Sequence, residues 1–248
     1  MGLLLKDKVI FLTGGAAGIG YECAKVYIQE GAILVVFDKI VAKIDGLSMS
    51  FVGDVSNAAE VQESIRNTIN QFGRIDAVHN NAGIAHPSKP IHETTEEEWN
   101  NLINTNLKSV FLTTKFAFET LKQHKGTILN TSSMVGAIGQ AQHAAYSATK
   151  GAMNALTKSM ALDYASFGIR VNAVAPAGVW TPMLRTWALD QPNPTTISEY
   201  LDQIHPLGFC PEGDVIADVC TFLLSEKARF ITGCILPVSG GAELGYRR

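Results

Sequence analysis

The sequence predicts a single α/β domain built on a doubly wound parallel sheet with helices on both faces. Short β-branched runs alternate with segments of helical periodicity along the whole chain, and the first such run leads into a glycine-rich turn. The 248 residues suffice for one large domain with a well-formed core. Because the chain has no internal repeat and no linker-like tract, we expect residues 1–248 to form one domain.

The strands and helices follow one another in a regular order. Residues 9–12 and 33–37 are continuous apolar runs, as expected for strands buried on both faces. Between them, apolar residues recur at helical spacing from Ile19 to Tyr27, and Gly31 ends the segment. Further strands are expected over residues 50–52, 75–79, 127–130, 170–174 and 234–237, and helices over residues 61–72, 96–123, 145–167 and 215–224.

The regular alternation breaks down in residues 176–211, which hold six of the nine prolines. A segment of that length without secondary structure is usually functional when it lies inside a compact domain. We therefore expect residues 177–211 to form a loop or lid that covers the substrate.

Composition and charge weigh against several classes of partner. The net charge of −3 argues against nucleic acid and against an anionic membrane surface. No apolar run approaches the ~20 residues that a membrane span needs, and the apolar stretch near the start is too short for a signal peptide. The four cysteines and the histidines show neither metal-ligand spacing nor a disulfide framework, so we expect reduced core thiols, no metal site and a cytoplasmic location.

The glycine-rich turn from Thr13 to Gly20 lies between the first strand and the first helix. Glycines at such a turn let the backbone approach a pyrophosphate, while the helix N-terminus faces its charge. A plain tight turn is the alternative, but the position after a strand and before a helix favours dinucleotide binding.

Acidic and amide side chains follow the next three strands. Asp38 comes after the second strand, where a carboxylate accepts hydrogen bonds from ribose hydroxyls and repels a 2′-phosphate. The sequence therefore predicts NAD rather than NADP, although Lys39 adjoins Asp38 and a solvated loop acid is the alternative interpretation. Asp54-Val55 and Asn81-Ala82-Gly83 close the third and fourth strands, at the sheet edge where ligands bind.

Tyr146 and Lys150 lie four residues apart, so on a helix they project from the same face. An ammonium ~4 Å from a phenol is worth roughly 4 kcal/mol at an effective dielectric constant of ~20, or about three pKa units. Burial would oppose part of that shift. We expect Lys150 to lower the pKa of Tyr146 enough for acid–base catalysis, whereas these two residues alone could equally belong to a surface helix.

In this order and spacing, the motifs resemble those of the short-chain dehydrogenase/reductase family, in its NAD-preferring branch. The resemblance implies a Rossmann-type fold over essentially the whole chain, and a homotetrameric, NAD-dependent oxidoreductase that interconverts a secondary alcohol and a ketone. It rests on the glycine turn, Asp38, Asp54-Val55, Asn81-Ala82-Gly83, Asn106, Ser133, Tyr146, Lys150 and the segment from Pro176 to Thr181.

The resemblance also implies a role for each matching residue. Tyr146 exchanges a proton with the reacting oxygen, Ser133 hydrogen-bonds that oxygen, and Lys150 lowers the pKa of Tyr146 and holds the nicotinamide ribose. Asn106 kinks its helix and binds a water that links Lys150 to solvent. The residues expected to contact the cofactor are Gly14, Gly18, Ile19, Gly20, Asp38, Asp54, Val55, Asn81, Ala82, Gly83, Tyr146, Lys150, Val179 and Thr181.

Three departures from the family pattern are visible, one of which places Ser239 where Asp is common. The segment between Asp38 and Asp54 is shorter than the family usually has, so its helix should be truncated. Ala177 stands where the family usually has glycine, which would strain the backbone if φ were positive.

The candidate substrate residues point to a small, mostly apolar secondary alcohol or ketone, cyclic ones included, with lid-to-core packing as the alternative role. They are Val135, Gln140, His143, Trp180, Met183 and Trp187. Other reactions also remain open: a lyase or isomerase that uses bound NAD transiently, and reduction of a 3-oxo acyl thioester, which fits Asp38 poorly because the family's biosynthetic reductases generally use NADPH. An NAD-sensing protein without turnover is disfavoured, since the catalytic set is complete.

Overall fold

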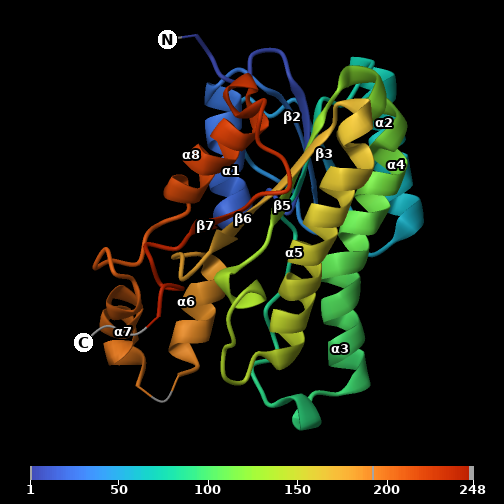
Figure 1. Ribbon diagram of the computed structural model, residues 1–248. Coiled ribbons are helices and arrows are strands. Elements are labelled where there is room, and N and C mark those ends of the chain that lie inside the picture. Colours follow the sequence, from blue (N-terminus) through green and yellow to red (C-terminus); the bar gives the residue numbers. More distant parts are fainter. Residues whose placement is uncertain (1, 192, 246–248) are drawn as a thin grey trace.

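A single parallel sheet of seven strands forms the centre of the molecule, in the order β3-β2-β1-β4-β5-β6-β7 (Figure 1). The computed structural model describes residues 2–191 and 193–245. The order reverses between β1 and β4, which confirms the predicted doubly wound fold and places the binding crevice at that point. The strands are β1 (Val9–Thr13), β2 (Ile33–Asp38), β3 (Met49–Val52), β4 (Ala77–Asn80), β5 (Thr127–Thr131), β6 (Arg170–Pro176) and β7 (Ile235–Val238).

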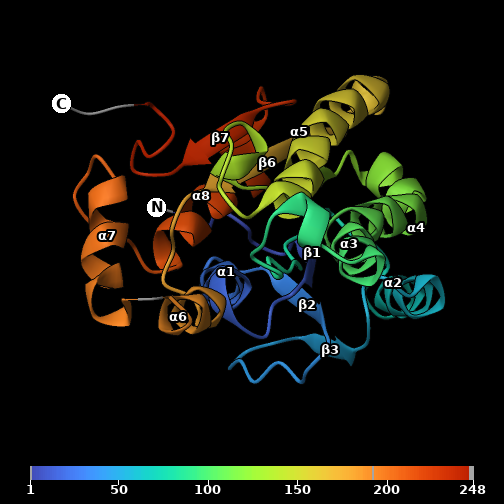
Figure 2. The same ribbon diagram turned by 90° about the horizontal axis from the view of Figure 1, so that it is seen from below.

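The sheet is covered on both faces because its strands are apolar on both sides. Along β1, Ile10 and Leu12 belong to one core cluster, whereas Val9 and Phe11 belong to the other. The first cluster is closed by α1 (Gly18–Gln29) and α8 (Asp214–Leu224), and the second by α2 (Ala58–Phe72), α4 (Ser109–His124) and α5 (Ala144–Tyr164) (Figure 2).

The helix expected over residues 96–123 is interrupted. It consists of α3 (Glu96–Ile103), a π-helical turn (Asn104–Lys108) and α4. A capping box opens α3, since the Thr95 side chain accepts from the Glu98 amide and the Glu98 carboxylate accepts from the Thr95 amide. The disturbance expected at Asn106 is therefore present as one turn of wider helix.

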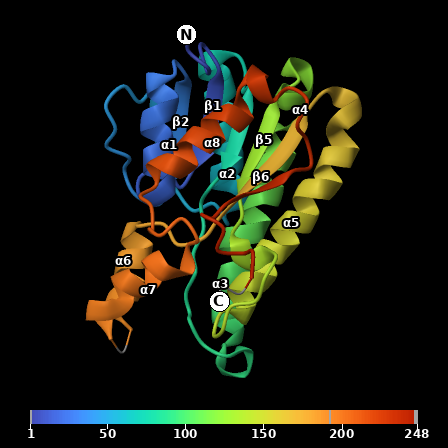
Figure 3. The same cartoon turned by 60° about the vertical axis from the view of Figure 1, so that its left-hand side comes forward.

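Two segments differ from their expected conformation. Between β2 and β3, residues 39–48 contain no helix, so the short connection has lost it rather than truncated it. Within residues 177–211, where a loop was expected, α6 (Pro182–Leu189) and α7 (Ile197–Ile204) lie beyond the ends of the strands (Figure 3). The Thr181 side chain caps α6 and Pro182 begins it, so this proline starts a helix rather than preventing one.

Across the described ranges, no helix is both long and apolar enough to cross a membrane.

Candidate active site

The glycine turn after β1 leaves room for a ligand at the start of α1. Gly14 and Gly18 have φ of 68° and 58°, which favours glycine. A Cβ on Gly20 would lie 1.9 Å from the Gly14 carbonyl oxygen, so no side chain fits there. Ala17 precedes the helix without a side-chain cap, and the first turn of α1 has no acidic residue. The first amides of α1 can therefore bind an anion such as a pyrophosphate.

Asp38 ends β2 beside this turn. Its carboxylate accepts from the Ala16 amide at 2.9 Å and from the Ile40 amide at 3.3 Å. The neighbouring cation is already paired, because Lys39 Nζ lies 3.0 Å from Asp54 Oδ2. Although burial raises the pKa of Asp54, hydrogen bonds from Ser56 and the Lys39 charge lower it further, so the net shift is downward.

Asn81 ties the end of β4 to the glycine turn. Its Nδ2 donates to the Gly14 carbonyl at 2.8 Å, and the Asn81 and Ala82 amides donate to Thr13 Oγ1 at 3.1 and 3.2 Å. The Asn81 side chain therefore supports the turn rather than pointing freely toward a ligand.

Ser133, Tyr146 and Lys150 line one end of the cavity, as predicted. Ser133 follows β5, and Tyr146 and Lys150 lie in the first two turns of α5. The Ser133 hydroxyl is a hydrogen-bond partner of Tyr146, and Lys150 Nζ lies 5.7 Å from the centre of the Tyr146 ring. Lys150 Nζ donates to the Thr131 carbonyl at 2.6 Å.

The expected lowering of the Tyr146 pKa is wrong for this structure. Burial raises the pKa of Tyr146, and the Ser133 hydrogen bond offsets only part of that rise. Burial also lowers the pKa of Lys150 to about 8. The loss of hydration therefore outweighs the attraction between ammonium and phenolate, because Lys150 directs its charge at the Thr131 carbonyl rather than at the phenol oxygen.

Asn106 supports the site from behind. Its Oδ1 accepts from the Ile84 amide at 2.8 Å, and its Nδ2 donates to the Ile84 carbonyl at 2.9 Å and to Thr149 Oγ1 at 3.1 Å. A Cβ on Gly83 would lie 3.3 Å from Asn106 Oδ1 and 3.7 Å from Lys150 Nζ, so these residues meet at one point. Asn106 is fully buried and does not line the cavity.

A cavity of about 750 Å³ joins the glycine turn to the Tyr146 end. Most of the predicted site residues line it, namely Gly14, Gly18, Ile19, Asp38, Val55, Asn81, Ala82, Gly83, Ser133, Val135, Gln140, His143, Tyr146, Lys150, Val179, Thr181, Met183 and Trp187. Ala177 also lines it, without the positive φ that would have strained it.

Three of the residues expected to contact cofactor or substrate do not line the cavity. Gly20 lies under the turn, and Asp54 faces Ser56 and Lys39. Trp180 lies instead beside a smaller surface hollow, where the Arg185 guanidinium stands 5.1 Å from its ring. Trp180 pairs with Glu212 through its backbone.

The structure adds wall residues that the sequence did not indicate. Ser88 hydrogen-bonds Nε2 of His143 at 2.9 Å, while Nδ1 of His143 faces the Ala141 carbonyl at 3.1 Å. The His143 ring meets Tyr146 edge to face. Tyr200 and Ile204 of α7 complete the apolar wall. No local pattern marks these residues, because they reach the cavity from a loop and from the unexpected α7.

Comparisons with known proteins agree with this geometry. A family model described as enoyl-(acyl carrier protein) reductase matches residues 14–243. L-fucose dehydrogenase of Bos taurus is 38% identical over 254 residues, which cover 100% of this chain and 94% of that protein. Levodione reductase of Leifsonia aquatica is 33% identical, with 97% and 96% covered.

The solved structure of Thermoplasma acidophilum aldohexose dehydrogenase superposes with a TM-score of 0.94 at 31% identity, and covers 100% of this chain and 98% of that one. Ser133, Tyr146 and Lys150 share one end of the cavity. The chain belongs to the short-chain dehydrogenase/reductase family and is a nicotinamide-dependent oxidoreductase that interconverts secondary alcohols and ketones.

Proposed function

We propose that the protein is an NAD-dependent dehydrogenase that oxidises a small cyclic secondary alcohol reversibly to its ketone, with Tyr146 as the acid–base group. The observation that carries the proposal is one continuous cavity, with the glycine turn and Asp38 at one end and Ser133, Tyr146 and Lys150 at the other.

The residues at the first end suit a dinucleotide. The turn from Gly14 to Gly20 and the free amides of α1 would hold the pyrophosphate, and Asp38 would accept from the adenosine ribose. Val179 and Thr181 would contact the nicotinamide. When bound, NAD supplies the hydride acceptor of the oxidation.

The residues at the second end suit proton exchange. Tyr146 would take the hydroxyl proton of the alcohol, while Ser133 would hydrogen-bond the same oxygen and hold it in place. Lys150 Nζ, 5.7 Å from the centre of the Tyr146 ring, would favour the phenolate together with the positive nicotinamide of bound NAD. Asn106 holds the Ile84 backbone and so keeps the floor of the site rigid.

The cofactor is NAD rather than NADP in this proposal. A 2′-phosphate would meet the Asp38 carboxylate, and Lys39 is engaged by Asp54 at 3.0 Å. The charge that could neutralise the phosphate is therefore held by another carboxylate.

The substrate end of the cavity has two kinds of lining. Met183, Trp187 and Tyr200 contribute apolar side chains to the lining, whereas Gln140 contributes a polar amide. A ring with one apolar face and hydroxyl groups on its edge suits both kinds. Sugars in their ring form belong to this class, in keeping with the relatives named for L-fucose and aldohexose.

We also propose a homotetramer in the cytoplasm. The family resemblance implies four subunits paired through α4 and α5, and Phe111 and Leu162 on these helices are 54% and 81% exposed. The four cysteines are free, in keeping with a reducing compartment.

The decisive experiment replaces Tyr146 with phenylalanine. Removing the phenol oxygen should lower turnover of a cyclic alcohol by at least about 100-fold, while NADH binding, followed by fluorescence, is retained. Tyr164→Phe, farther along α5, is the matched control and should keep full activity.

Near-normal turnover by Tyr146→Phe would overturn the catalytic assignment. NADH should accumulate in proportion to the alcohol consumed; turnover without net NADH would favour the lyase or isomerase alternative. Activity confined to acyclic alcohols would exclude the cyclic substrate class.

A further inference from the structure

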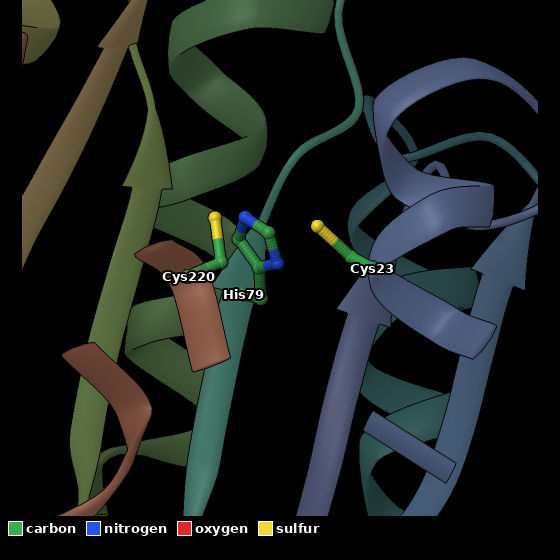
Figure 4. Close-up of side chains that lie close together, drawn as sticks. All are labelled: Cys23, His79 and Cys220. Carbon is green, nitrogen blue, oxygen red and sulfur yellow. The ribbon is translucent and has the colours of Figure 1, made fainter. Parts of the chain in front are cut away.

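A cluster of soft ligand atoms lies buried between α1, β4 and α8, outside the active site. Cys23 Sγ, Cys220 Sγ and a ring nitrogen of His79 all lie within 4.8 Å of one another, and all three residues are fully buried (Figure 4). Tyr27, one helical turn after Cys23, places its hydroxyl 2.9 Å from His79 Nδ1.

The hydrogen bonds around His79 fix which ring nitrogen carries the proton. The Gly14 carbonyl can only accept, so Asn81 directs Nδ2 toward it and Oδ1 toward Thr131. The Thr131 hydroxyl donates to that Oδ1 at 3.1 Å, and must therefore accept from His79 Nε2 at 3.0 Å.

His79 Nδ1 is consequently the unprotonated nitrogen and accepts a hydrogen bond from the Tyr27 hydroxyl at 2.9 Å, a bond that a metal ion at Nδ1 would replace. A neutral imidazole whose second nitrogen donates to a fixed oxygen is the usual form of a metal-binding histidine.

We propose that Cys23, Cys220 and His79 Nδ1 bind one zinc ion, with the Tyr27 hydroxyl as the fourth donor. Two thiolates and an imidazole are common zinc ligands, and ligand atoms around a tetrahedral zinc lie roughly 3.5 Å apart. The donor atoms of Cys23, Cys220 and His79, all within 4.8 Å of one another, lie near that spacing.

Charge selects a divalent ion for this site. On binding, each thiol forms a sulfur–zinc bond and releases its proton to solvent, so Zn²⁺ and two thiolates with neutral His79 and Tyr27 make a complex of zero net charge. A monovalent copper ion would leave one negative charge in an apolar core, which is costly. The site would tie α1 to α8 and, through Thr131 and Asn81, brace the turn at Gly14.

The test measures zinc directly. The full-length protein is refolded once with zinc sulfate and once with a chelator, then desalted, and its metal content and melting temperature are measured. We expect about one zinc per chain and a higher melting temperature in the zinc sample. Cobalt in place of zinc should give the intense absorption of a cobalt–thiolate bond.

Variants locate the ion. Cys23→Ala and Cys220→Ala should each weaken zinc binding at least about tenfold, whereas Cys234→Ala, a cysteine outside the cluster, should bind as the parent protein does. Zinc at background level in the refolded parent protein would overturn the proposal, as would a Cys23–Cys220 disulfide found by mass spectrometry. If the alanine variants do not fold, the cobalt spectrum of the parent protein decides the question alone.

Discussion

Tyr146 and Lys150 show how burial and charge compete within a few residues. Both groups lose hydration in the cavity wall, which raises the pKa of the phenol and lowers that of the amine to about 8. The Lys150 ammonium donates a hydrogen bond to the Thr131 carbonyl at 2.6 Å. In the free enzyme Tyr146 is therefore protonated. Its phenol can act as a base only when a further positive charge enters the site.

This balance predicts the titration of Tyr146. In the ligand-free enzyme its phenolate should appear only above pH 10.0, the ordinary value for tyrosine, because burial favours the neutral phenol. Oxidised NAD carries a positive nicotinamide and should move the midpoint to lower pH. The measurement is the ultraviolet absorbance of phenolate, taken as the difference between the parent protein and Tyr146→Phe. A Tyr146 phenolate present near neutrality without cofactor would contradict the expectation.

Asp38 predicts the cofactor preference. Asp38→Ala removes the acceptor for the ribose hydroxyls, and a hydrogen bond to a charged group is worth about 1.5–3 kcal/mol, so kcat/KM with NAD should fall at least about tenfold. Efficiency with NADP should fall less or rise. Asp45→Ala, an exposed acid in the same connection, is the control. A parent enzyme that prefers NADP would refute the role given to Asp38.

Among the elements, the π-helical turn between α3 and α4 is the one that the site depends on. In an ordinary α-helix each backbone hydrogen bond spans one residue fewer than in the π-helical turn, so Asn106 would point in a different direction. The wider turn brings the Asn106 side-chain amide to the Ile84 backbone and to Thr149 of α5. One side chain therefore joins the π-helical turn, the segment after β4 and α5.

Replacing that side chain should cost stability. Asn106→Ala leaves the Ile84 amide and carbonyl without their partner, and we expect the free energy of unfolding to fall by about 2–3 kcal/mol. Urea unfolding followed by circular dichroism measures it. Asn100→Ala, exposed on α3, should change stability by less than about 0.5 kcal/mol. Equal effects of the two substitutions would show that Asn106 does not brace the site.

The whole molecule consists of two cores on either side of one sheet, with α6 and α7 added beyond the strand ends. The reversal of strand order between β1 and β4 opens the crevice that holds both the glycine turn and Tyr146. The outer side of α4 and α5 still exposes large apolar side chains, Phe111 and Leu162 among them.

This exposed face predicts the effect of a charge on assembly. Phe111→Glu should split the proposed tetramer, because it would bury a carboxylate between subunits. Val52→Glu, on the edge strand β3 and 59% exposed, should leave the assembly intact. Size-exclusion chromatography with light scattering gives the mass of each variant. A tetramer that survives Phe111→Glu would place the subunit contacts elsewhere.

Local patterns in the sequence were enough to predict much of this protein. The buried strands, the turn from Thr13 to Gly20, and the joint placement of Tyr146 and Lys150 all follow from periodicity or from spacings of a few residues. The helices of residues 177–211 were not predicted, because the prolines of this segment, including Pro182 at the start of α6, were interpreted as breaks in the regular alternation.

Tertiary structure alone decided which distant groups meet and how much water they keep. Trp180 lines a separate surface hollow, and Lys39 is paired with Asp54. The hydration that Tyr146 loses raises its pKa, whereas the sequence predicted that the pKa would be lowered. Cys23 and Cys220 are nearly two hundred residues apart in the sequence, yet they share one buried cluster with His79. Such contacts depend on the packing of whole helices across a sheet, and no short spacing in the sequence predicts them.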